Sequence, residues 1–321
     1  MYMKFCVIGY GRWGKNLYNT LVNLVGKENV YVYDSDEQNT KKIRNSLQSV
    51  EEVIQNKDIS NILISTPAST HFELSHKFLE AKKNIFCEKP VSLSTKEVNS
   101  LIQTSRKNKN VFLVGHTFLF NDSINYIKKN IKNNKINLKI ISGRYSSYST
   151  NVNDVNVLWD FGPHVISISN YIVGDEVVDA KIIPLYFDQR GQLAACNINL
   201  VYKNGVNSIF ELSWLSIDKK REIDFIGESK MYRWNDLKPT SPIEYIKKVF
   251  PEKNIVGPYK HFHTILNKKE IPAIQQSAPL ENELNYFISN IKKNNYSNHL
   301  SNLTFSYEVI KVIEDLEKQL I

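Results

Sequence analysis

Hydrophobic and polar positions follow two different patterns along this chain of 321 residues. Up to about residue 120, short apolar runs alternate with segments in which apolar residues recur every three or four positions. A run as continuous as Asn61 to Thr66 is typical of a strand buried on both faces. The regular alternation of such strands with helices predicts an α/β fold that begins with a Rossmann-type doubly wound parallel sheet in residues 1–120.

After residue 120, one helix is followed by long segments in which apolar and polar residues alternate, as in strands with one buried face. Strands are predicted at residues 138–148, 178–187, 193–202, 206–215, 221–226 and 230–234. A helix over 160–173 interrupts this series, and two amphipathic helices close the chain. We therefore expect a second, α+β domain at residues 121–321 with a large, mostly antiparallel open sheet. Residues 236–277 show no clear periodicity.

The first apolar run ends in a glycine-rich turn that opens a helix. Its characteristic residues are Gly9, Gly11, Arg12, Trp13 and Gly14. In this spacing the first glycine permits the turn, the second leaves room for a pyrophosphate, and the third lets the helix pack on the strand. Asp34 ends the second strand, at the offset where a carboxylate accepts ribose hydroxyls. The pattern predicts an NAD site, with a glycine turn that binds no nucleotide as the alternative.

NAD is expected rather than NADP. The carboxylate of Asp34 would repel a 2′-phosphate, and neither Ser35 nor Asp36 supplies an arginine that could receive one.

Polar residues also follow the ends of later strands in the first half. Thr66 and Pro67 follow one strand, His71 begins the next helix, and Glu88 and Lys89 end another strand. Ligands of open parallel sheets bind at this edge, where the Lys89 ammonium could stabilise a developing negative charge on a substrate oxygen. His71 could equally be a solvated residue in a first helical turn.

Asp160 and His164 lie one helical turn apart and share a helix face, with Pro163 expected in the first turn. The imidazole could work as a general base that the carboxylate orients. From spacing alone, Asp160 could instead be an N-cap and His164 a buried structural histidine.

Taken together, these motifs resemble the glucose-fructose oxidoreductase/inositol dehydrogenase (Gfo/Idh/MocA) family. The resemblance rests on the glycine turn, Asp34, Thr66-Pro67 with Thr70-His71, Glu88-Lys89-Pro90 and Asp160-Phe161-Gly162-Pro163-His164. It implies that Lys89, Asp160 and His164 are catalytic, and that Glu88 and His71 line the nicotinamide ribose. It also implies a second domain for substrate binding and oligomerisation, and it allows a cis Lys89–Pro90 bond, which the family often has.

Other residues resemble members that act on nucleotide-linked sugars in surface-polysaccharide pathways. They are Asn16, Val114-Gly115-His116-Thr117-Phe118 and Asn156-Val157-Leu158-Trp159-Asp160. The resemblance departs at Lys15, where that group often has Pro, and at Val165, where it commonly has Asp. His116 and Arg144 could reach the substrate, or could be ordinary strand-end and surface residues.

The resemblance thus implies an NAD-dependent oxidoreductase acting on a ring hydroxyl or keto group of a sugar. A dehydrogenase of a free cyclitol or aldose is the enzymatic alternative, and a non-catalytic NAD-binding sensor or scaffold is the alternative of another class.

Composition bears on the binding partners, on disulfide and metal sites, and on the location of the protein. The formal charge of +8 comes from lysines spread along helix faces and loops. This distribution does not favour nucleic-acid binding. The positive electrostatic field would still attract phosphorylated ligands. Cys6, Cys87 and Cys196 have no paired spacing, and neither a disulfide nor a metal site is expected. A signal peptide or membrane-spanning run is not apparent, so we expect a cytoplasmic protein. The resemblance implies a homodimer or homotetramer.

Overall fold

The computed structural model describes residues 3–133, 136–149, 154–249, 266–297 and 299–320. The chain divides into two compact units that are not consecutive in sequence. Unit 1 consists of Met1–Asn121, Val152–Ser167 and Ser277–Lys318. Unit 2 consists of Asp122–Asn151, Ile168–Gln276 and Gln319–Ile321. Two later segments of the chain therefore complete the unit that the first 121 residues begin.

Unit 1 contains a sheet of five parallel strands in the order β2-β1-β3-β4-β5. The strands are β1 (Lys4–Ile8), β2 (Val30–Tyr33), β3 (Ile59–Ile64), β4 (Asn84–Glu88) and β5 (Phe112–Gly115). Their side chains are almost all buried, as the continuous apolar runs predict. The predicted parallel, doubly wound sheet is confirmed.

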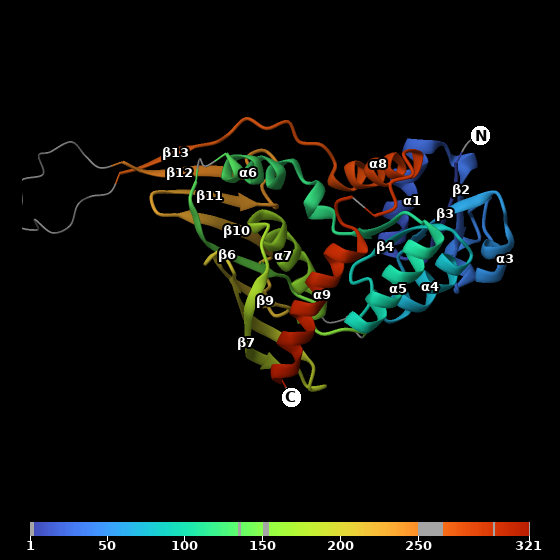
Figure 1. Ribbon diagram of the computed structural model, residues 1–321, viewed down its shortest axis with the longest axis horizontal. Coiled ribbons are helices and arrows are strands. Elements are labelled where there is room, and N and C mark those ends of the chain that lie inside the picture. Colours follow the sequence, from blue (N-terminus) through green and yellow to red (C-terminus); the bar gives the residue numbers. More distant parts are fainter. Residues whose placement is uncertain (1–2, 134–135, 150–153, 250–265, 298, 321) are drawn as a thin grey trace, which may run out of the picture. The chain divides into compact units, whose positions relative to one another are not determined.

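Helices cover both faces of this sheet (Figure 1). The helices of unit 1 are α1 (Arg12–Val25), α2 (Glu37–Thr40), α3 (Val50–Gln55), α4 (His71–Glu80), α5 (Thr95–Asn108), α8 (Pro279–Lys292), α9 (Leu303–Glu317) and the first part of α7 (Val157–Val173). Helix α1 contacts α8, whereas α5 contacts α4 and α9. The two closing helices of the chain thus belong to unit 1.

Unit 2 contains a sheet of eight strands in the order β13-β12-β11-β10-β6-β9-β8-β7. The strands are β6 (Leu138–Ser146), β7 (Val177–Phe187), β8 (Leu193–Tyr202), β9 (Asn207–Ser213), β10 (Lys220–Gly227), β11 (Lys230–Asn235), β12 (Ile243–Val249) and β13 (Leu266–Glu270). Only the pair β6 and β9 runs parallel among these described strands. The expected large, mostly antiparallel sheet is confirmed.

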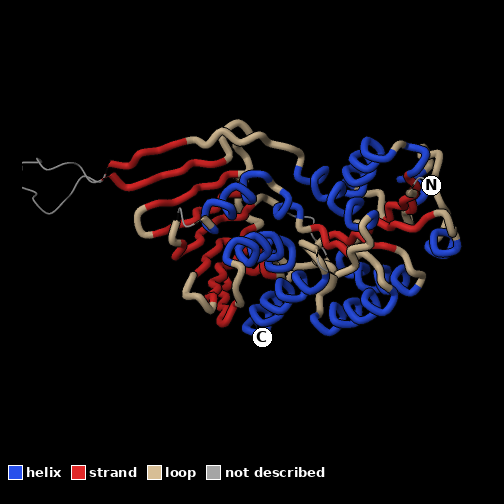
Figure 2. Tube along the Cα trace, turned by 45° about the horizontal axis from the view of Figure 1, so that its top comes forward, coloured by secondary structure: helices blue, strands red, loops and turns tan. Residues whose placement is uncertain are grey.

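One face of this second sheet is covered and the other is open. Helix α6 (Asp122–Lys132) contacts β11, and α7 reaches the sheet through Ser169, whose Oγ lies 2.6 Å from the Oγ of Ser208 on β9 (Figure 2). Ile183, Ile209 and Ile140 lie on the opposite face and remain exposed. A sheet face with several exposed isoleucines is thus left without cover in the described chain.

Strands β12 and β13 fall in the stretch where the sequence shows no apolar alternation. Ion pairs connect these two strands instead. Lys269 lies 2.6 Å from Glu244, and Lys247 lies 3.2 Å from Glu270. Charged side chains are typical of strands at the edge of a sheet, where they oppose pairing with another chain.

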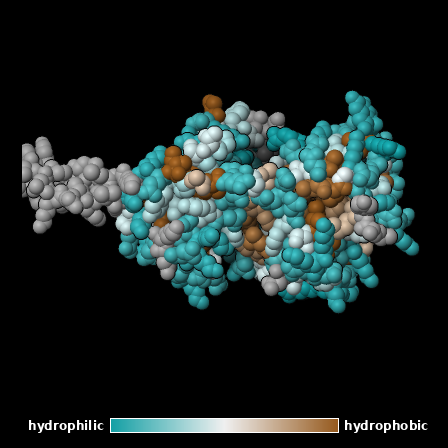
Figure 3. All heavy atoms as spheres, turned by 90° about the horizontal axis from the view of Figure 1, so that it is seen from above, coloured by the Kyte–Doolittle hydropathy of each residue, from teal (hydrophilic) through white to brown (hydrophobic). Residues whose placement is uncertain are grey.

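Among the described residues, no helix has the length and apolar composition needed to cross a membrane. On the face drawn in Figure 3, most residues are hydrophilic and the hydrophobic ones occur in small groups.

Candidate active site and cofactor site

The glycine turn between β1 and α1 has the geometry that close approach of a pyrophosphate requires. Gly9 adopts a positive φ of 87°. A Cβ at Gly14 would lie 1.9 Å from the carbonyl oxygen of Gly9, so only glycine lets the helix approach the strand this closely. A Cβ at Gly11 would meet no atom within 4 Å, so the space beside this residue is open. Arg12 and Trp13 begin α1 next to that space and are exposed.

Asp34 organises the glycine turn. Its Oδ2 accepts a hydrogen bond from the backbone N–H of Tyr10, in the middle of the turn. Its Oδ1 accepts from the backbone N–H of Asp36 at 2.9 Å and from Asn39 Nδ2 at 3.1 Å. A carboxylate has about four lone-pair sites, so ribose hydroxyls can share these oxygens. Asn39 was not singled out by the sequence, because its spacing from Asp34 matches no motif.

Trp13 connects the glycine turn to the end of β4. Its indole Nε1 donates a hydrogen bond to the Glu88 carboxylate. Glu88 is buried, and a Cβ at Gly115 on the neighbouring strand β5 would lie 3.0 Å from its carboxyl oxygens. The absence of a side chain at Gly115 therefore makes room for the carboxyl group.

Two buried carboxyl groups lie in this region. Burial raises the pKa of Glu88 to about 7, although the Trp13 hydrogen bond and nearby Lys89 act to lower it. Burial and the charge of Glu88 raise the pKa of Glu283 well above its ordinary value. Glu283 Oε2 accepts from Thr117 Oγ1 at 2.7 Å, and its Oε1 has no partner among the described residues. Burial therefore disfavours the charged form of Glu283.

The sequence contained a signal for Glu283 that was missed. It lies four residues before Phe287, on the apolar stripe of α8, where an acidic residue is unexpected.

Lys89 extends from the end of β4 to the first half of α7. Its Nζ donates to the backbone carbonyl of Asp160 at 2.8 Å and lies 3.4 Å from Asp160 Oδ1. Both side chains are mostly buried. The two residues that the family resemblance paired are thus in direct contact, although 71 positions separate them in sequence.

Helix α7 begins earlier than the predicted residue 160, and this earlier start determines where Asp160 lies in the helix. The helix begins at Val157, and Asn156 is its cap, because Asn156 Oδ1 accepts from the N–H groups of Leu158 and Trp159 at 3.0 and 3.2 Å. Asp160 is therefore within the helix and is not its N-cap.

Pro163 was expected in the first turn, but it lies inside the helix. Since proline has no N–H, Pro163 cannot donate to the carbonyl of Trp159, and the helix lacks one backbone hydrogen bond at this turn. The next carbonyl, that of Asp160, is the one that accepts from Lys89.

His164 follows one turn after Asp160 and is partly exposed. Its ring lies edge-on to Phe118, with 5.3 Å between the ring centroids. The carbonyl of His164 accepts from Ser167 Oγ at 2.9 Å. The Nδ1 atom of His164 is buried, although the residue as a whole is partly exposed.

His71 is 2% exposed, so it is not the solvated residue that was one of its two interpretations. Its two ring nitrogens lie 2.8 Å from the carbonyl oxygens of Thr66 and Pro90. Burial lowers the pKa of His71, and these two carbonyls act in the opposite direction. His71 thereby ties the end of β3 to the segment that carries Lys89, whose bond to Pro90 is cis.

Thr66 and Pro67 form the turn after β3. Thr66 Oγ1 lies 2.7 Å from Thr70 Oγ1, and the Pro67 carbonyl accepts from the N–H of Thr70 at 3.0 Å. A Cβ at Gly9 would lie 2.9 Å from Thr66 Cγ2, so this turn packs directly against the glycine turn.

His116 and Arg144 are the two further substrate candidates, and they belong to different units. His116 is 3% exposed, its Nε2 lies 3.0 Å from Ser306 Oγ, and burial lowers its pKa to about 3. The ring packs against α9, with its centroid 5.6 Å from that of Phe305, and nearby Lys89 also acts to lower the pKa of His116. Arg144 pairs with Glu211 at 3.3 Å on the open face of the second sheet, opposite the face that α7 covers. Its placement matches the interpretation as a surface residue.

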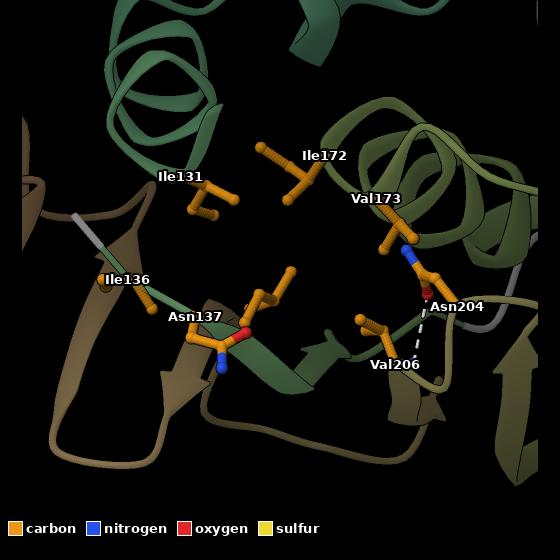
Figure 4. A pocket seen from close by; sticks show the side chains of 8 residues that line it. Ile131, Ile136, Asn137, Ile172, Val173, Asn204 and Val206 are labelled. Carbon is orange, nitrogen blue, oxygen red and sulfur yellow. Dashed lines mark hydrogen bonds between the residues drawn. The ribbon is translucent and has the colours of Figure 1, made fainter. Parts of the chain in front are cut away.

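A pocket in unit 2 offers no comparable chemistry (Figure 4). It is lined by Ile131, Ile136, Asn137, Leu138, Ile172, Val173, Asn204 and Val206. The Asn204 Oδ1 accepts from the backbone N–H of Val206 at 3.2 Å. None of these lining residues is titratable.

Residues 3–116 match the Gfo/Idh/MocA family, described as an oxidoreductase family with an NAD-binding Rossmann fold. Over these residues the chain is similar to that family. An uncharacterised oxidoreductase of Bacillus subtilis is 25% identical over 248 residues, which are 71% of this chain and 72% of the relative. A myo-inositol 2-dehydrogenase of Thermotoga maritima is 23% identical over 229 residues, covering 66% of this chain and 68% of the relative.

A UDP-N-acetylglucosamine 3-dehydrogenase of Acidithiobacillus ferrooxidans is 24% identical over 191 residues, covering 57% of this chain and 58% of the relative. A solved structure with that name and source superposes with a TM-score of 0.83 at 16% identity, covering 98% of this chain and 96% of the other. The fold is therefore that of the family in both units.

NAD fits the site in this chain. The open space at Gly11 lies at the N-terminus of α1, where backbone N–H groups and the helix dipole favour an anion. Asp34 lies beside the same turn and can accept from ribose hydroxyls.

Proposed function

We propose that this protein transfers a hydride between NAD and a ring hydroxyl or keto group of a nucleotide-linked sugar, in the synthesis of a surface polysaccharide. The observation that carries the proposal is the contact of Lys89 with Asp160 on the helix that also presents His164. The similarity to a UDP-N-acetylglucosamine dehydrogenase supports the substrate class.

NAD supplies the hydride acceptor when it is bound. In our proposal the glycine turn and Asp34 hold its pyrophosphate and adenosine ribose, and Thr66, Pro67, His71 and Glu88 border the nicotinamide end. Trp13 supports Glu88 there through the indole hydrogen bond.

In the oxidative direction, His164 accepts the proton of the ring hydroxyl that is oxidised. Lys89 stabilises the negative charge that develops on the same oxygen. Asp160 positions the ammonium of Lys89 through its backbone carbonyl and carboxylate. The reductive direction uses the same residues, with His164 returning the proton.

A second candidate is the dehydrogenation of a free cyclitol, because a myo-inositol 2-dehydrogenase is similar over two thirds of this chain. A non-catalytic sensor or scaffold is less well supported, since it would not need Lys89, Asp160 and His164 in one arrangement.

Incubation with NAD and a panel of UDP- and dTDP-linked sugars, followed by nicotinamide absorbance at 340 nm, tests the proposal. We expect turnover with at least one nucleotide sugar and much weaker turnover with the same sugar free. Turnover of free myo-inositol but of no nucleotide sugar would contradict the substrate class. NAD binding without turnover of any sugar in either direction would favour the sensor.

We also propose that the protein forms a homodimer or homotetramer through the open face of the second sheet, and that it works in the reducing cytoplasm. The exposed Ile183 and Ile209 support the first proposal, and the three free, buried cysteines support the second.

A further inference from the structure

Helix α9 connects three segments that border the candidate site. Ser306 contacts His116 after β5, Glu314 contacts the start of α5, and Glu317 contacts the start of α7. All of these contacts lie within unit 1. A single helix therefore reaches the segment that follows Lys89 and the helix that carries Asp160 and His164.

Glu317 fixes the first turn of α7. Its Oε1 accepts from the indole Nε1 of Trp159 at 2.8 Å and from Asn156 Nδ2 at 3.2 Å. Because the Asn156 amide nitrogen is held by Glu317, its oxygen faces the helix and caps Leu158 and Trp159. A carboxylate near a helix N-terminus is also favoured by the helix dipole. Trp159, which is almost fully buried, directly precedes Asp160.

Glu314 acts in the same way on α5. Its two carboxylate oxygens accept from the backbone N–H of Thr95 at 2.8 Å and from the Thr95 hydroxyl at 2.7 Å. Thr95 is the first residue of the helix that follows the Lys89 segment. Both sides of the Lys89–Asp160 contact are thus connected to α9.

We propose that Glu317 is a positioning residue for catalysis, which holds the first turn of α7 so that Asp160 and His164 are presented to Lys89 and the substrate. This inference rests on the proposed function. Glu317 acts through Asn156 and Trp159 and does not itself touch the reacting groups.

The test compares Glu317→Ala, which removes the acceptor, with Glu317→Gln, which keeps an oxygen that can accept from Trp159. Glu308→Ala is the matched control, because Glu308 is an exposed residue of the same helix. Trp159→Phe removes one of the two donors to Glu317 and provides a second variant if Glu317→Ala does not fold.

We expect Glu317→Ala to lower kcat at least tenfold while the Kd of NAD, measured by calorimetry, changes less than twofold. Trp159→Phe should lower kcat by a smaller factor, and Glu317→Gln and Glu308→Ala should each retain at least half of kcat. If Glu317 only stabilised the fold, Glu317→Ala would lower the number of NAD sites per chain together with kcat.

A second readout does not depend on turnover. In protein with 13C-labelled histidine, the Cε1–H resonance of His164 is displaced by the ring of Phe118, and His164→Asn identifies it among the seven histidines. We expect this resonance to move in Glu317→Ala and to stay in place in Glu317→Gln and Glu308→Ala.

An unchanged kcat in Glu317→Ala, or equal loss in Glu317→Gln, would overturn the proposal. If no sugar is turned over by the unaltered protein, the proposed function fails on its own. The position of the His164 resonance then tests whether Glu317 is a positioning residue. That role is refuted if the resonance has the same position in Glu317→Ala as in the unaltered protein.

Discussion

Lys89 Nζ donates to the backbone carbonyl of Asp160 at 2.8 Å, and the carboxylate of the same residue lies 3.4 Å away. The shorter contact does not depend on the Asp160 side chain. Substitution of Asp160 therefore leaves the main contact of the ammonium in place, whereas substitution of Lys89 removes it.

This relationship predicts an order of effects within the catalytic trio. We expect His164→Ala to lower kcat roughly 10²–10⁴-fold, since it removes a positioned general base. Lys89→Met should lower it roughly 10²–10³-fold by removing the charge that stabilises the oxyanion, and Asp160→Asn should cost less. NAD affinity in His164→Ala should be nearly unchanged. Steady-state kinetics with an exposed control, Lys96→Met, checks the order, and full activity in His164→Ala would make that residue structural.

Two glycines of the turn should respond differently to the same added methyl group. In Gly11→Ala the Cβ enters open space, so the free energy of unfolding should hardly change while the Kd of NAD rises at least tenfold. In Gly14→Ala the Cβ meets the Gly9 carbonyl oxygen, and a loss of stability of about 1–3 kcal/mol is expected from overpacking. Urea unfolding and NAD titration of both variants separate the two effects. Unchanged NAD binding in a folded Gly11→Ala would argue against a pyrophosphate at this turn.

Cofactor choice should depend on Asp34. Its carboxylate lies against the Tyr10 N–H and would repel a 2′-phosphate, so NAD should bind at least tenfold more tightly than NADP. Asp34→Ser should reduce this ratio, and the exposed substitution Glu37→Ser should leave it unchanged. Calorimetric titration with both cofactors measures the ratio. Equal binding of NADP to the unaltered protein would be incompatible with this assignment.

Glu88 should make stability depend on pH. Its pKa is raised from 4.5 to about 7, so the folded protein binds a proton more strongly than the unfolded chain between these values. The free energy of unfolding should then fall as pH rises from about 5 to about 7. In Glu88→Gln this fall should be smaller by about 3 kcal/mol, and the amide oxygen can still accept from Trp13.

Urea unfolding at pH 5 and pH 7.5 measures this effect, with the exposed Glu80→Gln as control. Glu283, whose pKa is also raised, should add a fall of the same sign that remains in Glu88→Gln. An identical pH dependence with and without Glu88 would show that its carboxyl group is not coupled to folding.

The open sheet face should hold the subunits together. We expect Ile183→Glu and Ile209→Glu to shift the protein toward monomers, because each places a charge on an exposed apolar face. Ile217→Glu is the control, since Ile217 is exposed in the turn after β9. Light scattering at micromolar concentration gives the mass. A monomeric mass of the unaltered protein would refute assembly through this face.

The sequence predicted those elements whose residue pattern is compatible with only one local structure. The apolar run ending at Ile64 had to be a buried strand, and the glycine spacing fixed the turn from Gly9 to Gly14. Periodicity also located α8 and α9, but an apolar stripe shows which face of a helix is buried and not what buries it. The assignment of these helices to unit 1 was therefore not predictable.

Two capping-box patterns in the sequence do not form in the structure. Thr70-x-x-Glu73 and Ser94-x-x-Glu97 both fit a capping box, yet neither hydroxyl caps its helix. Thr70 bonds within the turn after β3, and the start of α5 is held by Glu314, which lies 219 positions away. Contacts at such separation compete with local ones, and a sequence pattern contains no information about them.

The discontinuous course of unit 1 has a consequence for proteolysis. The chain passes from one unit to the other between residues 121 and 122, 151 and 152, 167 and 168, 276 and 277, and 318 and 319. A single cut between residues 168 and 276 of unit 2 therefore divides the chain into two fragments that each contain part of unit 1, and only noncovalent contacts then hold them together. Cleavage between residues 122 and 151 would leave α7 and α9 attached to unit 1 only through their noncovalent contacts with it, so a nicked protein should keep its NAD site for as long as those contacts hold.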